Sequence, residues 1–281
     1  MLTPDILSEL QDLRYLTWSR ARESSGTAGS YLKSYDTRSG RKIYYKLSCF
    51  DSLRGITGHE SVNELIVDRL LTLLGIEHLS YQLIHAMVRI EGKDYETWLC
   101  ASENFREPGE SKLPLDDFYD LYRTVDESPL DFCLRNGWGE YIFRMILIDF
   151  LILNRDRHGA NIEILRDWHS GRTRPAPLFD HGLSLVYSCA DEAAIKKFDV
   201  MADLPVQCFV GSHSAAENLR LVPSDVFTGL KTLEERDRSV LLRGLECTLS
   251  KAYLDKIWDL IWSRWQYLGE FFSQQKETME K

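Results

Sequence analysis

The sequence lacks a long apolar run: no window of about 18 residues is both uncharged and apolar. It also lacks the basic start and apolar core of a signal peptide, because acidic residues occur within its first ten positions, MLTPDILSEL. We therefore expect a cytoplasmic protein that makes no use of a membrane.

Positive charge is also in short supply, with 34 Lys and Arg against 43 Asp and Glu and a formal net charge of −9. A general nucleic-acid binder needs a basic face that neutralises phosphates. The balance therefore argues against general nucleic-acid binding, although it leaves a local basic patch possible.

Paired cysteines are absent as well: the 6 cysteines are scattered and form no Cys-x-x-Cys motif. This pattern favours buried free thiols over a disulfide framework or a zinc site. With 281 residues, of which 44% are hydrophobic and 27% charged, the chain has the composition of an ordinary globular protein. Its length allows one large domain or two lobes.

The first hundred residues are predicted to be mostly β-structure with one substantial helix. That helix should begin at an apparent capping box, Thr57 to Glu60, and end at Leu74 before Gly75. A shorter helix is predicted near residues 6–13. Strands are expected at 15–22, 31–35, 41–48, 80–90 and 95–101.

Beyond a polar linker at 103–111 the chain is predicted to be mostly helical. The helix at 139–153 is apolar nearly all round and should be buried. The aromatic residues of the last helix, 249–274, favour packing on a core over an exposed dimer face. Other helices are expected at 115–125, 130–134 and 234–245, with a short one at Ser224-Asp225 and a β-hairpin joining 162–165 to 178–179. This gives an α+β fold with an N-lobe at 1–107 and a C-lobe at 108–281.

Two loops carry the clearest chemical signal. Residues 154–161 read Asn-Arg-Asp-Arg-His-Gly-Ala-Asn and follow the apolar helix, and residues 179–182 read Phe-Asp-His-Gly. Asn161 and Asp180 offer the oxygen ligands that Mg²⁺ prefers. Asp156 has no obvious ligand role, so we expect it to orient or deprotonate an acceptor hydroxyl.

A lysine and a glutamate in the first hundred residues are candidates for the other half of such a site. Lys46 lies inside a predicted strand, and Glu64 lies at the border of the polar arc of the following helix. Glu64 can turn inward, and a buried carboxylate would hold the ammonium of Lys46 against phosphates. The alternatives are a solvent-facing lysine and a surface glutamate without a partner.

The segment between the first two strands is rich in glycine and small hydroxyl residues. Ser24, Ser25, Gly26 and Gly29 could cover a polyphosphate, since glycine lets backbone N–H groups approach it closely. A flexible hairpin turn is the alternative. The polar linker, in which we include Glu103, is expected to run past the adenine and offer backbone hydrogen bonds.

Each of these motifs is weak alone, but their order along the chain is specific. A glycine loop, a strand lysine, a helix glutamate, a linker, a buried helix, D-x-x-x-x-N and D-x-G follow one another. That order is the bilobal layout of protein kinases. It predicts an ATP-dependent phosphotransferase that uses ATP and Mg²⁺.

The two loops, with Asn63-Glu64 before the apolar helix, resemble the HipA-like bacterial Ser/Thr kinases over roughly residues 24–182. The D-R-H-x-x-N wording is also similar to phosphoinositide 3/4-kinases. The resemblance implies a serine/threonine protein kinase with Asp156 as catalytic base, Asn161 and Asp180 as metal ligands and Lys46 on the phosphates. It also implies a protein partner such as an antitoxin.

The same resemblance implies autophosphorylation in the glycine-rich loop, on Ser24, Ser25 or Ser30. The chain departs from the family pattern where His181 replaces the phenylalanine of D-F-G. We also expect the front of the chain to be too short for the extra N-terminal subdomain of full-length HipA, and the partner protein that this subdomain would contact to be different or separately encoded.

Other readings remain open at this level. A lipid or small-molecule kinase keeps the chemistry and changes the acceptor. A kinase-shaped binding module with little turnover is a third hypothesis. His158 either braces its loop or contacts phosphate or acceptor, with bracing favoured. Asp149 is expected to be a satisfied polar group of the scaffold.

Overall fold

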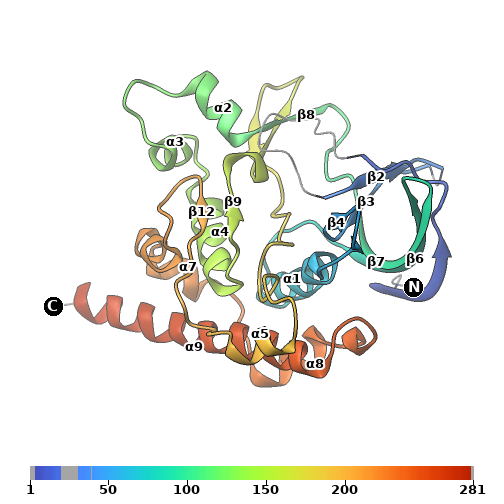
Figure 1. Ribbon diagram of the computed structural model, residues 1–281. Coiled ribbons are helices and arrows are strands. Elements are labelled where there is room, and N and C mark those ends of the chain that lie inside the picture. Colours follow the sequence, from blue (N-terminus) through green and yellow to red (C-terminus); the bar gives the residue numbers. More distant parts are fainter. Residues whose placement is uncertain (1–3, 20–30, 39, 280–281) are drawn as a thin grey trace.

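The structure is a computed structural model, and it describes residues 4–19, 31–38 and 40–279. A β-rich N-terminal region lies at one end of the molecule, and a mostly helical region lies at the other (Figure 1). Helix α1 (Glu60–Leu74) lies between them. This division agrees with the α+β architecture that the sequence predicts.

The described N-terminal residues form a five-stranded sheet with the order β1-β6-β7-β3-β2. Its neighbours pair antiparallel except β1, which pairs parallel with β6. The strands are β1 (Ile6–Asp12), β2 (Lys33–Asp36), β3 (Ile43–Leu47), β6 (Gln82–Ile90) and β7 (Lys93–Glu103); a small separate ribbon pairs β4 (Phe50–Asp51) with β5 (Gly55–Ile56).

The helix predicted near residues 6–13 is wrong, because this segment is strand β1. Its apolar residues have helical spacing, but pairing with β6 provides backbone partners that a single short helix would not have. Of the strand predicted at 15–22, residues 20–22 lie outside the described residues, and within the rest Ser19 makes an isolated bridge to Lys33.

Helix α1 spans the predicted residues, and Gly75 ends it in a left-handed conformation with φ 74°. The predicted capping box is wrong. The N-cap is His59, and no side chain caps the helix. The Glu60 carboxylate instead accepts from the backbone N–H of Cys49 at 3.3 Å and from the Tyr31 hydroxyl at 3.3 Å.

The helical region is built around α4 (Gly139–Leu151) and the long α9 (Lys251–Met279), which pack against each other. Trp258 and Trp265 of α9 are buried, which confirms that this helix packs on the core. The other helices are α2 (Leu115–Tyr122), α3 (Pro129–Arg135), α5 (Glu192–Lys197), α6 (Ala215–Asn218), α7 (Ser224–Thr228) and α8 (Arg238–Leu241).

Short strands position the two loops of interest. A β-hairpin is present, but its second strand is β11 and not the expected residues 178–179, because Leu178 makes a bridge to His78 instead. Strand β10 pairs with β11 on one side and with β8 on the other. The helix expected at 234–245 is broken into short turns around α8. The short strands near the two loops are β8 (Glu110–Pro114), β9 (Asp156–Arg157), β10 (Glu163–Asp167), β11 (Thr173–Pro175) and β12 (Gln207–Cys208).

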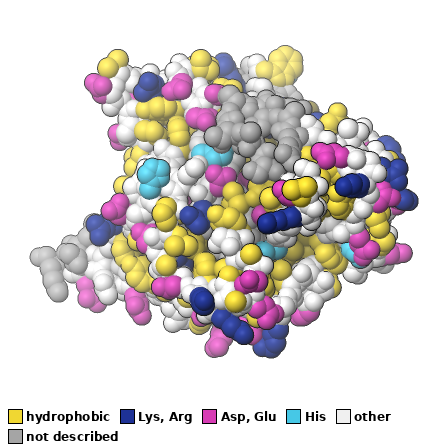
Figure 2. All heavy atoms as spheres, viewed as in Figure 1, with side chains coloured by type: hydrophobic (Ala, Val, Ile, Leu, Met, Phe, Trp, Pro, Cys, Tyr) yellow, Lys and Arg dark blue, Asp and Glu magenta, His cyan; other side chains and the backbone are white. Residues whose placement is uncertain are grey.

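Across the surface seen in Figure 2, acidic and basic side chains are interspersed. Within the described part of the chain, no helix is both long enough and apolar enough to cross a membrane.

Candidate active site

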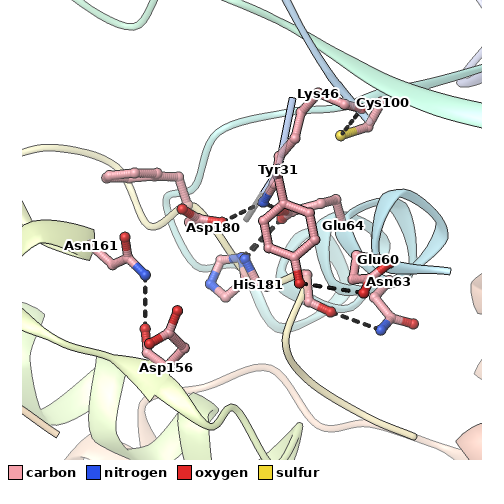
Figure 3. Close-up of polar contacts among 12 residues, drawn as sticks. Tyr31, Lys46, Glu60, Asn63, Glu64, Cys100, Asp156, Asn161, Asp180 and His181 are labelled. Atoms are coloured by element: carbon pink, nitrogen blue, oxygen red, sulfur yellow. Dashed lines mark hydrogen bonds and ion pairs between the residues drawn. The ribbon is translucent and has the colours of Figure 1, made fainter. Parts of the chain in front are cut away.

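Lys46 is held at the centre of a charged cluster between the sheet and the helical region (Figure 3). It lies on β3, and its ammonium donates to Glu64 Oε1 of α1 at 2.8 Å and to the Asp180 carboxylate. Burial lowers the pKa of Lys46, but the charges of Asp180 and Glu64 outweigh burial and hold it well above its usual value. The structure thus forms the ion pair that the sequence suggested between Lys46 and Glu64.

Glu64 is fully buried and uses both of its carboxylate oxygens. Oε1 accepts from Lys46, and Oε2 accepts from the backbone N–H of His181 at 2.9 Å. The glycine after His181 lies close to this pair, and a side chain there would be in contact with it. A Cβ at Gly182 would stand 3.4 Å from both Glu64 Oε1 and Lys46 Nζ, and 3.1 Å from the Cβ of Glu60.

Asp180 presents its carboxylate to Lys46 from a strained backbone. Its φ is 60°, in the left-handed region that non-glycine residues rarely adopt, and such strain is often found at functional sites. Burial raises the pKa of Asp180, but the charges of Lys46 and Lys33 and the hydrogen bond from Lys46 outweigh it, so the pKa lies well below its usual range. The carboxylate is therefore ionised at neutral pH.

Asp156 and Asn161 lie across from this cluster, and the side-chain amide of Asn161 donates to the backbone carbonyl of Asp156 at 2.8 Å (Figure 3). Asp156 lies on β9, and Asn161 ends a 3₁₀ turn, Gly159–Asn161. With its nitrogen used in this way, Asn161 keeps its amide oxygen for another partner. The hydrogen bond from Asn161 to the carbonyl of Asp156 therefore closes the loop between the two motif residues.

Arg157 joins the two loops, and sequence reasoning did not single it out. Its guanidinium is 1% exposed and pairs with Asp149, with Nε to Oδ2 at 2.9 Å. Its Nη1 donates to the carbonyls of Asn161 at 3.1 Å and Phe179 at 2.9 Å. Its position beside Asp156 was visible in the sequence, but the partner loop was not. Asp149 is a satisfied polar group, as predicted.

Two histidines of the motifs have different surroundings. His158 lies beside Asp156, with Nε2 3.6 Å from Oδ1, which leaves its predicted alternatives open. His181 is buried, and burial together with the Arg157 charge lowers its pKa well below the usual value, so the ring is neutral. Its backbone rather than its ring holds Glu64.

The remaining predicted residues are less closely associated with the cluster. Ser24, Ser25, Gly26 and Gly29 lie outside the described residues. Glu103 ends β7, and its exposed side chain accepts from Arg41 at 3.1 Å. A hollow of about 510 Å³ occurs elsewhere, between α7 and α9, and none of the predicted site residues lines it.

The site offers oxygen atoms of the kind that a magnesium ion binds. In the described part of the chain, no group of three or more His, Cys, Asp or Glu could hold a metal alone. Mg²⁺ on a nucleotide needs less, because it is commonly held by one or two protein oxygens together with phosphates and water. The amide oxygen of Asn161 and the ionised carboxylate of Asp180 fit that requirement.

Comparisons with known proteins bear on the fold. The structure is similar to the Helicobacter pylori proinflammatory kinase CtkA with a TM-score of 0.67 and 12% identity, covering 95% of this chain and 99% of that one. No family model matches the sequence. No curated protein matches it either.

Two weaker likenesses are to HipA and WaaP. Shewanella oneidensis HipA, solved with HipB and operator DNA, has a TM-score of 0.43 and 15% identity over 90% of this chain and 67% of its own. WaaP, solved with acyl carrier protein, has a TM-score of 0.37 and 12% identity, and the match covers 92% of this chain and 89% of WaaP. On the likeness to CtkA, this chain has a protein-kinase-like fold.

Proposed function

We propose that the protein is an ATP-dependent kinase that transfers the γ-phosphate of ATP to a serine or threonine hydroxyl of a protein. One observation carries the proposal: Lys46 is joined to both Glu64 and Asp180, directly across from Asp156 and Asn161. The protein-kinase-like fold supports it.

The residues divide the work of phosphoryl transfer between binding and proton transfer. Lys46, held by Glu64, binds phosphate oxygens of ATP. Asn161 and Asp180 would hold magnesium, which supplies charge neutralisation to the phosphates when it is bound. Because Asp180 already lies against Lys46, one cluster serves both the phosphates and the metal.

Asp156 receives the proton of the acceptor. As the hydroxyl oxygen forms its bond to the γ-phosphorus, the bond from that phosphorus to the β–γ bridging oxygen breaks, and ADP leaves with that electron pair. The hydroxyl proton moves to a carboxylate oxygen of Asp156, whose side chain is 30% exposed and accessible to an acceptor.

The test is transfer of radiolabelled γ-phosphate from Mg-ATP, offered separately to a mixture of proteins and to phosphoinositide vesicles. We expect label on phosphoserine or phosphothreonine with the wild type and none with Asp156→Asn. Asp120→Asn, an equal charge change on the exposed surface of α2, should behave as the wild type. Label on the lipid alone would replace the protein acceptor, and no label at all would contradict the proposal.

We also propose that the enzyme modifies Ser24, Ser25 or Ser30 of its own chain, as the resemblance to HipA-like kinases suggests. Mass spectrometry of the 23–33 peptide after incubation with Mg-ATP tests this. An unmodified peptide from an active enzyme would contradict it.

A further inference from the structure

A second lysine lies directly opposite Lys46 on the neighbouring strand. Lys33 of β2 is in register with Lys46 of β3. The N–H and C=O of Lys33 bond to Ser19 at 2.9 and 3.0 Å, on the far side from β3. Lys33 and Lys46 are therefore a non-hydrogen-bonded pair, in which Cα atoms lie about 4.5 Å apart and the side chains share one face of the sheet.

Two ammonium groups facing each other across strands destabilise a sheet. Lys46 already pairs with two carboxylates, those of Glu64 and Asp180. Lys33 is exposed, and within the described ranges no carboxylate forms an ion pair with it. Its ammonium, on the same face of the sheet as Lys46, is therefore available to an anion.

A neighbouring lysine, directly before β3, has a different environment. Lys42 lies over the rings of Tyr35 and Tyr44, 4.3 and 4.7 Å from their centroids. These cation–π contacts occupy its ammonium. Lys42 is therefore a matched control, since its removal changes the net charge equally and touches the same two strands.

Resting on the kinase function proposed above, we infer that Lys33 is a second phosphate-binding residue, which contacts the polyphosphate chain of ATP from β2 while Lys46 contacts it from β3. The ligand class is a nucleoside polyphosphate. Because Lys33 acts by charge, its contribution grows with the number of phosphates, is absent for adenosine and falls as salt rises.

Binding of Mg-ATP, adenosine and inorganic tripolyphosphate is measured by calorimetry for the wild type, Lys33→Met, Lys33→Arg and Lys42→Met. We expect Lys33→Met to weaken Mg-ATP and tripolyphosphate about tenfold, the loss of one charge-assisted hydrogen bond, and to leave adenosine unchanged. Lys33→Arg should recover most of the affinity, and Lys42→Met should bind as the wild type. The melting temperature of ligand-free Lys33→Met should change little, because the side chain is exposed and removing it takes away both the repulsion from Lys46 and the attraction to Asp180.

An Mg-ATP affinity of Lys33→Met within about twofold of the wild type would overturn the inference. So would an equal loss for adenosine, which would make the effect structural. A wild type that binds Mg-ATP but transfers no phosphate would contradict the proposed kinase activity. The affinities of the Lys33 variants would still test this inference. A wild type that binds neither Mg-ATP nor tripolyphosphate overturns both.

Discussion

Most buried apolar residues of the sheet belong to a different core from the helix that lies against it, with Leu83 of β6 as an exception. Tyr45, Leu47 and Leu99 of the sheet form a core of their own with other strand residues. The apolar face of α1 instead joins the large core of the helical region, with α4 and α9. Apolar packing therefore groups α1 with the helical region, whereas the predicted boundary after residue 107 groups it with the sheet; that boundary stays a prediction.

The polar contacts of α1 reach both regions. Arg69 pairs with Asp5 before β1, Nε to Oδ2 at 2.8 Å, whereas four other side-chain contacts go to the helical region. Arg69 of α1 donates to the carbonyls of Leu241 and Arg243 at 3.0 and 2.8 Å. Asn63 donates to the carbonyls of Gly182 and Ser184 at 2.9 and 3.0 Å. All four acceptors lie in the helical region.

The Lys46–Glu64 ion pair joins the sheet to the helical region. Lys46 belongs to the sheet, and Glu64 is attached to the helical region through α1 and through the backbone of His181. The ion pair therefore crosses the boundary between the two cores. A shift of the sheet relative to the helical region would change this contact, so phosphate binding should depend on how the two regions sit together.

The largest predicted effect comes from removing Arg157, the tether that joins the 154–161 and 179–182 loops inside the helical region. Arg157→Met leaves the Asp149 carboxylate, which is only 13% exposed, without its cation and should lower the free energy of unfolding by about 3–5 kcal/mol. Urea unfolding measures it. The control is Arg14→Met at the exposed Asp12 pair beside the sheet, which should change stability little. Equal effects of the two substitutions would contradict the assignment of Arg157 as the tether.

A smaller effect separates the two attachments of α1. Asn63→Ala removes the donor of two buried carbonyls and should cost about 1–3 kcal/mol. Ser61→Ala removes contacts toward the sheet, where the Ser61 hydroxyl donates to the Lys46 carbonyl at 3.2 Å.

Hydrogen exchange distinguishes these two variants. We expect faster exchange near residues 182–187 for Asn63→Ala and near residues 46–48 for Ser61→Ala. The opposite pattern, or the same pattern in both, would show that α1 is not attached as described.

The smallest effect is a dependence on pH where α1 meets the segment leading to β6. His78 Nε2 lies 2.7 Å from Asp68 Oδ1 of α1. Burial lowers the pKa of His78, but hydrogen bonds to Asp68 and the Ile76 carbonyl and the Asp68 charge outweigh it and raise the pKa above 6.5.

Because the folded-state pKa is raised, this pair stabilises the protein fully below the unfolded pKa and loses that effect as pH rises through the folded pKa. The stability difference between the wild type and His78→Asn should therefore be larger at about pH 5.5 than at about pH 9. Urea midpoints at the two pH values measure it, and a difference that grows with pH would have the wrong sign.

Sequence reasoning found the parts of this molecule that depend on local pattern. The apolar periodicity of α1 and α4 and the glycine after Leu74 predicted those helices, and the border position of Glu64 predicted its pairing with Lys46. The likeness to CtkA bears out the kinase-like architecture.

The parts it missed depend on contacts between distant segments. Strand β1 exists because β6 lies beside it. Arg157 ties its own loop to Phe179, and Lys33 gains its meaning only from its register with Lys46. The false capping box has the same origin, because the Glu60 carboxylate is used by Cys49 and Tyr31.

The most direct test of the central claim is Mg-ATP turnover of the wild type beside Asp156→Ala and Asp180→Ala, with ATP binding measured on the same samples. Asp156 is assigned to proton transfer and Asp180 to the metal. We therefore predict a loss of turnover of at least about 100-fold in each variant, with Mg-ATP binding retained in Asp156→Ala. Turnover that survives both substitutions would contradict the account.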